Sequence, residues 1–195
     1  MKKKSRVVVT VVIAVVCVGL IVGLYYYFTN YKRASAEDMV ELNEVQKIIT
    51  YNLDSDYPAT PRETVKLYNR IITCFYNETY TDKELEQLAD QARKLFDEEL
   101  IANNPRDEYL TALKADIEEY HEKSRTITNS SVCKSNEVNY QTVDGAECAY
   151  VSSTYYINEK KKYSRTNQMY VLRKDADGHW KILVFYQIEG DSSDE

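Results

Sequence analysis

The sequence predicts an α+β protein, in which an apolar N-terminal helix precedes a domain of helices packed on an antiparallel sheet. Three observations support this fold class. Residues 7–28 carry no charge. Residues 35–120 repeat apolar side chains at helical spacing behind capping residues. Beyond Arg125, Thr, Val, Tyr and Ile become frequent and the apolar period falls to two, which is typical of strands.

The segment from Val7 to Phe28 is expected to be a transmembrane helix. Its 22 residues, at about 1.5 Å each, span roughly 33 Å, enough to cross a hydrocarbon core of about 30 Å. Tyr25, Tyr26 and Tyr27 end the segment, where a ring can stay in the acyl boundary while its hydroxyl reaches water. These tyrosines are therefore expected to mark one membrane interface.

Basic residues on the two sides of this segment predict its direction. The tail 1–6 holds four of them, whereas two closely follow the apolar run. Because basic flanks are retained in the cytoplasm, we expect a single-pass cell-membrane protein with a cytoplasmic N-terminus and residues 32–195 outside. The residues compared are Lys2, Lys3, Lys4 and Arg6 on one side, and Lys32 and Arg33 on the other.

Two further features of this region leave alternatives open. Ala34-Ser35-Ala36 resembles a cleavage site, so the rival interpretation is a signal peptide cleaved after Ala36. The apolar run exceeds the usual h-region of about 7–15 residues, and Lys32-Arg33 precede the site, so the sequence favours an uncleaved anchor. Gly19-x-x-x-Gly23 matches a helix-pairing motif, while the oligomeric state stays open.

Four helices are expected in the first half of the outer domain. The first starts at a Ser35 cap and ends near Tyr51. The second starts at Thr60, because Thr60-Pro61-Arg62-Glu63 combines an N-cap, a proline at N1 and a capping-box glutamate. Thr81 starts the third helix with the same capping box, and Asn104 opens the fourth. The apolar stripe on each helix predicts packing against a core.

Strands are expected in the second half. One strand contains Cys148–Ile157 and follows a tight turn at Asp144-Gly145. A looser, solvated connection at 158–162 leads to the strand Gln168–Arg173, and Asp175–Gly178 then turns the chain into Trp180–Tyr186. Both faces of these last two strands are apolar. They are therefore expected at the centre of the sheet, with helices covering one side.

The charge of the outer domain limits its partners. Residues 37–195 carry 19 basic and 31 acidic side chains, a formal net charge of −12. Such a surface repels phosphate backbones, so nucleic acid is excluded as an expected partner. The bilayer itself, and a protein or envelope ligand of unknown identity, remain as expected partners.

The residues Asp175-Ala176-Asp177-Gly178-His179-Trp180-Lys181-Ile182 resemble the closing hairpin of NTF2-like domains. Over residues 40–187 the chain is also similar to an uncharacterised family of single-pass membrane proteins from Gram-positive anaerobes, which carry an N-terminal anchor and a segment like Tyr57–Glu63. This resemblance implies an NTF2-like (cystatin-like) cone, in which a curved antiparallel sheet encloses an apolar pocket. Because NTF2-like folds include isomerases, dehydratases and binding modules, the fold assigns no activity.

Residues that could carry chemistry are few. Neither metal, thiol-redox nor nucleotide motifs are present in the sequence, so no catalytic, cofactor-binding or metal residues are assigned. His121 falls at the polar end of a helix and His179 in a hairpin turn, where both are expected to be exposed. Tyr155 and Tyr170 could point into a pocket, although strand tyrosines commonly serve packing.

The cysteines leave one disulfide open. Cys133 and Cys148 both lie in the strand region of a domain expected outside the cell, so they could form a bridge. A two-residue turn at Asp144-Gly145 would instead place Gln141 opposite Cys148.

Together these features divide the chain into a cytoplasmic tail 1–6, a transmembrane helix 7–28, a juxtamembrane linker and helix 29–59, an NTF2-like domain 60–188 and an acidic tail 189–195. The function expected is a non-catalytic binding or scaffolding module, anchored in the membrane and presented outside it. The alternatives are a small hydrolase or isomerase that uses a buried carboxylate, and a subunit of a membrane-associated assembly.

Overall fold

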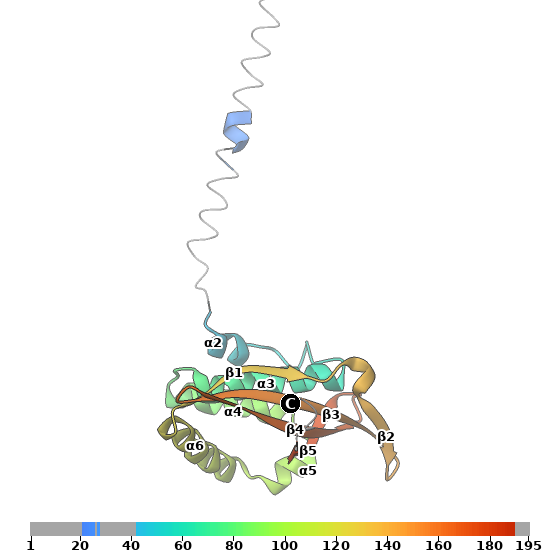
Figure 1. Cartoon of the computed structure of the whole chain (residues 1–195). Coiled ribbons are helices and arrows are strands. Elements are labelled where there is room, and N and C mark those ends of the chain that lie inside the picture. The colour runs from blue at the N-terminus through green and yellow to red at the C-terminus, as the bar shows by residue number, and fades with distance from the viewer. Residues whose placement is uncertain (1–20, 26, 28–41, 190–195) are drawn as a thin grey trace, which may run out of the picture. The chain divides into compact units, whose positions relative to one another are not determined.

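The computed structural model describes residues 21–25, 27 and 42–189, and it divides into two compact units, Met1–Leu42 and Asn43–Glu195 (Figure 1). Residues 21–25 and 27 are helical and exposed. Within the described ranges, no helix has both the length and the apolar character needed to cross a bilayer. Most of the anchor expected at Val7–Phe28, the basic tail, Ala34–Ala36 and residues 190–195 lie outside the described residues.

The second unit is an α+β domain, as the sequence predicts. Its helices precede the sheet and pack against it, and the strands are antiparallel to their neighbours. The helices are α2 (Glu44–Ile49), α3 (Pro61–Asn77), α4 (Asp82–Lys94), α5 (Glu98–Asn103) and α6 (Arg106–Glu122). The short α5 was not expected from the sequence.

The predicted capping residues begin helices α3 and α4. Thr60 accepts a hydrogen bond from the Glu63 amide at 3.2 Å, with Pro61 in the first turn of α3. Thr81 and Glu84 form a reciprocal capping box at the start of α4. Each cap satisfies amides that the helix itself leaves unbonded. These short-range contacts explain why both starting residues are predictable from sequence.

The helix α2 belongs to the same compact unit as the later elements. Gln91 of α4 reaches its C-terminal end, where the Gln91 Nε2 donates to the carbonyls of Ile48, Ile49 and Tyr51 at 3.2, 2.9 and 2.9 Å. The Ile48 carbonyl also accepts the Tyr51 amide at 3.1 Å, and the Gln91 amide adds hydrogen bonds to the carbonyls that follow the last turn of α2. The compact unit therefore starts at Asn43, earlier than the residue 60 proposed from the sequence.

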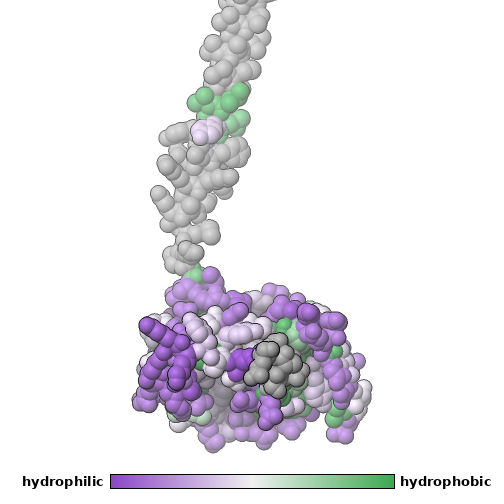
Figure 2. Space-filling model, in the orientation of Figure 1, coloured by the Kyte–Doolittle hydropathy of each residue, from purple (hydrophilic) through white to green (hydrophobic). Residues whose placement is uncertain are grey.

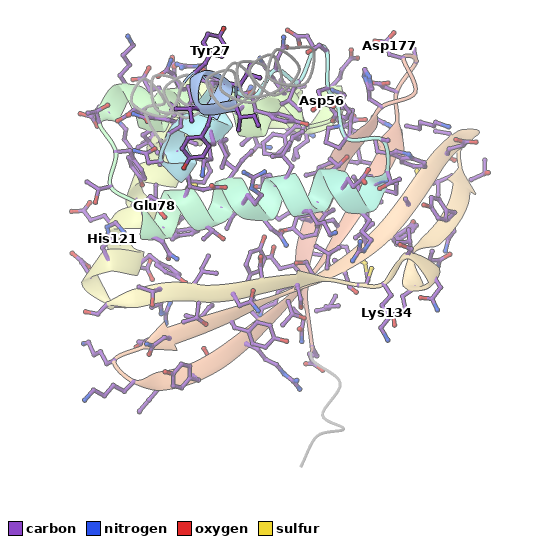
Figure 3. All side chains as sticks on the ribbon, turned by 90° about the horizontal axis from the view of Figure 1, so that it is seen from above. Tyr27, Asp56, Glu78, His121, Lys134 and Asp177 are labelled. Atoms are coloured by element: carbon purple, nitrogen blue, oxygen red, sulfur yellow. The ribbon has the colours of Figure 1, made fainter. Side chains whose placement is uncertain are left out.

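The sheet contains β1 (Arg125–Val132), β2 (Asn139–Val143), β3 (Ala146–Glu159), β4 (Lys162–Lys174) and β5 (Trp180–Ile188). Its order is β1-β3-β4-β5, and β2 pairs with the first half of β3. A short 3-10 helix, Ser135–Glu137, joins β1 to β2. Ala149, Val151 and Leu172 share one face of the sheet and are fully buried, and Figure 3 shows α3 lying along the sheet.

The expected central position is correct for β4 and wrong for β5, which lies at the sheet edge. The beginning of β5 is covered: Ile182 donates to the Leu95 carbonyl and accepts from the Asp97 amide, both at 2.8 Å. Its second half is exposed, with Val184, Phe185 and Tyr186 at 42, 39 and 48%. The apolar residues on both faces of β5 therefore do not indicate burial between two strands.

Both of the first two hairpins turn through two left-handed residues. Asp144 and Gly145 have φ of 50° and 82°, and Lys160 and Lys161 have φ of 47° and 73°. Positive φ at both central residues is the turn geometry that matches strand twist. The connection after β3 is thus tight, although the sequence predicts a looser one.

Candidate functional site

Two of the cavities in the domain differ in chemistry. One, the tyrosine pocket, has a volume of about 380 Å³ and lies between α3, α6 and the buried sheet face. Its lining residues are mostly aromatic or aliphatic: Tyr68, Ile72, Tyr76, Tyr109, Ala112, Leu113, Asp116, Tyr120, Ile127, Tyr155, Ile157, Thr166, Gln168, Tyr170 and Phe185. A volume of this order suits a small organic molecule.

The floor of the tyrosine pocket is a chain of hydrogen bonds. The Tyr155 hydroxyl donates to Asn69 Oδ1 at 2.6 Å and lies 2.8 Å from the Tyr170 hydroxyl. The Tyr170 hydroxyl in turn lies 2.8 Å from Gln168 Oε1. The two tyrosine hydroxyls have one proton each, which is too few for the three contacts, so an amide must donate in one of them. If the Gln168 amide is turned, its Nε2 faces the Tyr170 hydroxyl and donates to it. Every contact is then satisfied.

Asn69 connects this floor to the sheet. It is 2% exposed on α3, and its Nδ2 donates to Ser153 Oγ at 2.8 Å. The Ser153 hydroxyl donates to the Ser131 carbonyl at 3.0 Å. A buried side-chain amide without hydrogen-bond partners would lower the stability of the fold, so Asn69 is tolerated in the core because of these bonds. They also fix the rings of the pocket floor in place.

One side of the pocket contains two stacked rings, one from α3 and one from α6. Tyr76 and Tyr120 have ring centroids 4.3 Å apart and an interplanar angle of 35°. The Tyr120 hydroxyl is buried and has no hydrogen-bond partner among the described residues. Burial first, and then the nearby Asp116 carboxylate, raise the pKa of Tyr76 to about 12. Both phenols therefore present neutral rings to the pocket at physiological pH.

The pKa values of the deeper phenols are also raised. Burial is the largest cause for Tyr68, Tyr109, Tyr155 and Tyr170. At Tyr170 the neighbouring Tyr155 adds to the effect, because two adjacent phenolates would repel each other. The hydrogen bonds of the floor thus join neutral groups.

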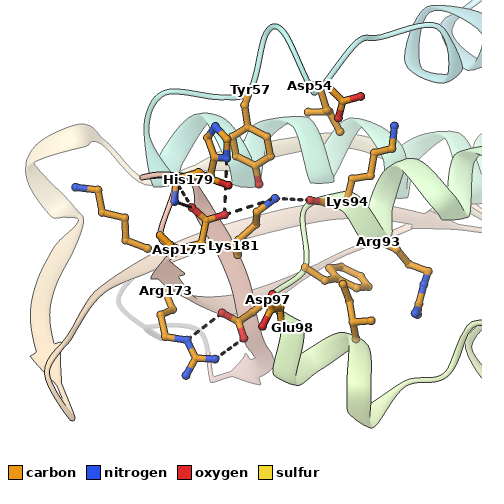
Figure 4. Close-up of a pocket in the computed structure, with 16 residues that line it drawn as sticks. Asp54, Tyr57, Arg93, Lys94, Asp97, Glu98, Arg173, Asp175, His179 and Lys181 are labelled. Carbon is orange, nitrogen blue, oxygen red and sulfur yellow. Dashed lines mark hydrogen bonds and ion pairs between the residues drawn. The ribbon is translucent and has the colours of Figure 1, made fainter.

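The second cavity, the charged cleft, has a volume of about 710 Å³ (Figure 4). Its lining residues are largely polar: Leu53, Asp54, Tyr57, Arg93, Lys94, Phe96, Asp97, Glu98, Ile101, Arg173, Lys174, Asp175, Ala176, Asp177, His179 and Lys181. Figure 4 shows Arg173 reaching Asp97, where Nε contacts Oδ2 at 2.9 Å and Nη2 contacts Oδ1. The buried Asp97 also caps α5 through the Glu99 amide. The hydrogen bond that Arg173 donates to Asp97 raises the pKa of Arg173.

A second group of charges lies at the β4–β5 turn, whose tip carries Asp177 (Figure 3). Asp175, Asp177 and His179 place ligand atoms within 4.8 Å of one another, so they are the residues that could hold a metal ion. However, Asp175 Oδ1 already accepts from the amides of Asp177 and His179 at 3.0 and 2.8 Å. These are the bonds of a turn cap, which accounts for the cluster.

Lys181 supplies the cation of this turn. Its Nζ lies 4.0 Å from Asp175 Oδ2, donates to the Lys94 carbonyl at 2.9 Å and sits 4.3 Å from the Tyr57 ring centroid. Burial lowers the pKa of Lys181, and the Asp175 carboxylate opposes that shift. The ammonium places a positive charge beside the Asp175 carboxylate. The charged cleft is therefore internally neutralised.

The histidines differ from each other in exposure. His121 is exposed, as expected, and its Nε2 lies 3.0 Å from the Tyr76 carbonyl. His179 is half-buried, because its ring stacks on Tyr57 with centroids 4.2 Å apart. Figure 3 places His121 beside Glu78, at the end of the domain away from Asp177. Neither histidine lines the tyrosine pocket.

The disulfide left open by the sequence is not formed. Cys133 and Cys148 are free thiols. The two-residue turn places Gln141 opposite Cys148, as its geometry predicts. Cys133 instead donates its amide to the Ser152 carbonyl at 3.0 Å, beyond the end of β1. The strand register therefore places the two cysteines opposite different residues.

Tyr155 and Tyr170 both line the tyrosine pocket, which the sequence left open, and other residues of the site were not expected from the sequence. Asn69 and Asp116 are the important additions. Asn69 interrupts the apolar stripe of α3, and a polar residue at a buried position was a usable signal. Asp116 looks in sequence like any carboxylate on a polar helix face, and only the position of α6 gives it a role.

The fold and its cavities define an α+β domain that holds a tyrosine-lined pocket between its helices and an antiparallel sheet. The chain belongs to the family described as a domain of unknown function (DUF6715), whose model matches residues 1–185. No curated protein matches the sequence.

Proposed function

We propose that this protein is a non-catalytic binding module, anchored in the cell membrane, that holds a small ligand in the tyrosine pocket. One observation carries the proposal: a pocket of about 380 Å³ whose wall is aromatic and whose polar floor is bonded internally. Rigid rings provide large contact area at a low entropy cost. The floor needs no ligand to satisfy its hydrogen bonds, so the pocket is preorganised.

The placement of carboxylates favours binding over the alternative hydrolase or isomerase. That alternative needs a carboxylate buried in the pocket, with a raised pKa. The buried carboxylate among the described residues is Asp97, which lines the charged cleft and pairs with Arg173. Asp116 lines the tyrosine pocket and is exposed. A screen of ester and isomerase substrates would support the enzyme instead if turnover were found and lost in Tyr155→Phe.

The membrane anchor, and the orientation of the protein in the membrane, are the parts of the proposal that rest on the sequence. The uncharged run Val7–Phe28 and the basic tail 1–6 support a cytoplasmic N-terminus and an outer domain. The order of helices and antiparallel strands around a pocket also supports an NTF2-like cone. A ligand held outside the membrane would then come from the envelope or the medium.

A pair of matched variants on α6 tests the pocket. Ala112 lines the pocket and is exposed, so Ala112→Trp fills the cavity without displacing core residues. Ala115 is exposed on the same helix outside the pocket lining. We expect aromatic fragments to bind the full-length chain, to bind Ala115→Trp equally, and to lose at least about tenfold in affinity for Ala112→Trp. Unchanged binding to Ala112→Trp would contradict the proposal.

Cysteine labelling in intact cells tests the orientation. Ser193→Cys in the C-terminal tail should react with a membrane-impermeant maleimide, whereas Ser5→Cys should react after lysis only. Unmutated cells measure the background from the native cysteines. The opposite labelling pattern would place the domain in the cytoplasm and refute this part of the proposal.

A further inference from the structure

The tyrosine pocket has an unusual balance of charge. Its lining contains seven aromatic rings, one carboxylate and no lysine, arginine or histidine. Burial keeps the phenols protonated, since the pKa of Tyr76 is raised to about 12 and those of Tyr109 and Tyr155 are raised further. The formal charge within the lining is therefore negative and comes from Asp116.

Asp116 has no cation of its own. It forms no ion pair with any residue that the structure describes, although the same helix and its neighbours carry several. Lys114, on the same helix, and Arg125, which follows that helix, pair with other carboxylates. Arg125 Nε contacts Glu159 at 2.6 Å, and Lys114 Nζ lies 3.7 Å from Asp82. The Asp116 carboxylate therefore remains available to a ligand.

The rings around Asp116 suit a cation as well. Aromatic faces attract a positive charge placed over them, most strongly when the charge is partly desolvated. The Arg93 guanidinium already lies over the Tyr109 ring, 5.6 Å from its centroid, in a cation–π contact. Arg93 itself lines the charged cleft rather than the tyrosine pocket. The stacked Tyr76 and Tyr120 line the same pocket as Asp116, and the Tyr120 hydroxyl has no described partner.

We propose that the tyrosine pocket binds an organic cation, namely a substituted ammonium group carried on an apolar body. This deepens the proposed binding function and rests on it. The ammonium group lies against Tyr76, Tyr120 and Asp116, and the apolar body extends toward the buried rings of Tyr155 and Tyr170. The formal charge of −12 on residues 37–195 further favours the approach of cations.

A matched pair of probes isolates the charge. Choline and its carbon isostere, in which a tert-butyl group replaces the trimethylammonium group, have nearly the same shape and differ in charge. Binding is measured by calorimetry on the full-length chain in phosphatidylglycerol nanodiscs, which contain no competing choline headgroup. We expect choline to bind at least about tenfold more tightly than the isostere, and the difference to shrink at high salt.

Variants locate the effect. Asp116→Asn should weaken choline about fivefold and leave the isostere unchanged, because only the cation interacts with the carboxylate. Tyr76→Leu should weaken choline about tenfold through loss of the ring face. Glu118→Gln is the matched control, since Glu118 is exposed on α6 outside the pocket lining. Circular dichroism and melting temperature verify that each variant is folded.

The outcomes separate the two proposals. Equal affinity of choline and its isostere, or full choline affinity in Asp116→Asn and Tyr76→Leu, would refute the cation proposal. If aromatic fragments still bound and Ala112→Trp still blocked them, the binding function would stand without it. If neither choline, nor its isostere, nor any fragment bound the wild-type chain, both proposals would be wrong.

Discussion

Several buried polar residues in this domain have partners that are distant in sequence. Tyr155 meets Asn69 across 86 positions, and Arg173 meets Asp97 across 76. In both cases a polar group is tolerated in a buried place because its partner arrives from another element. Such pairs bind the helices to the sheet and fix where the cavities form.

The Asp97–Arg173 pair gives a prediction for stability. Arg173→Leu leaves the Asp97 carboxylate buried, at 7% side-chain exposure, without its cation. We expect a loss of about 2 kcal/mol in the free energy of unfolding, measured by urea denaturation. Arg106→Leu is the control, because the Arg106–Asp90 pair is exposed at 41 and 48% and should matter little. Equal effects of the two substitutions would show that Asp97 does not depend on Arg173.

At the scale of elements, residues close in sequence form the hairpin turns and helix starts, but the residue types in a turn do not always favour its backbone conformation. The β3–β4 turn places Lys160 and Lys161 in left-handed conformations, which cost side-chain-bearing residues free energy. Asn158 supports the turn by accepting the Lys161 amide at 3.0 Å. The strands on both sides are long and paired, and they impose this turn despite its sequence.

Replacing this turn with a favoured sequence should therefore stabilise the domain. We expect the double variant Lys160→Asn, Lys161→Gly to raise the free energy of unfolding by about 1 kcal/mol. Lys162→Gly, one position later in β4, should lower it by about 0.5–1 kcal/mol, because glycine weakens an extended strand. Thermal and urea unfolding report both changes. A destabilised double variant would contradict the left-handed turn.

For the whole molecule, the raised pKa values of buried tyrosines predict how stability depends on pH. A phenol whose pKa is about 10 in the unfolded chain and about 12 in the fold, such as Tyr76 or Tyr80, holds its proton more tightly when folded. The stabilisation is complete below pH 10 and is lost as the pH rises from 10 to 12. Stability should fall across that range.

Urea denaturation at successive pH values measures this slope. Tyr76→Phe removes one of the contributing phenols, so its stability should decline less steeply between pH 10 and pH 12. Tyr163→Phe is the control, because the Tyr163 ring is 78% exposed. A wild-type stability that stayed constant up to pH 12 would show that the buried phenols do not control alkaline unfolding.

The sequence by itself determined the α+β class, the helix starts at Thr60 and Thr81, and the register that pairs Gln141 with Cys148. These features depend on interactions within a few residues, such as caps and two-residue turns, which a linear pattern records. The sequence left open whether Tyr155 and Tyr170 point into a pocket or serve packing, and the structure shows them buried in a pocket lining.

Only the tertiary structure decided that β5 is an edge strand, that Cys133 and Cys148 stay apart, and that Asp116 lines the pocket. A strand has the same apolar pattern in the sequence whether its edge is covered by a second strand or by a loop such as Leu95–Asp97. The position of α6 over the sheet depends on contacts between segments far apart in the chain. Periodicity carries no information about such contacts, because it describes one element at a time.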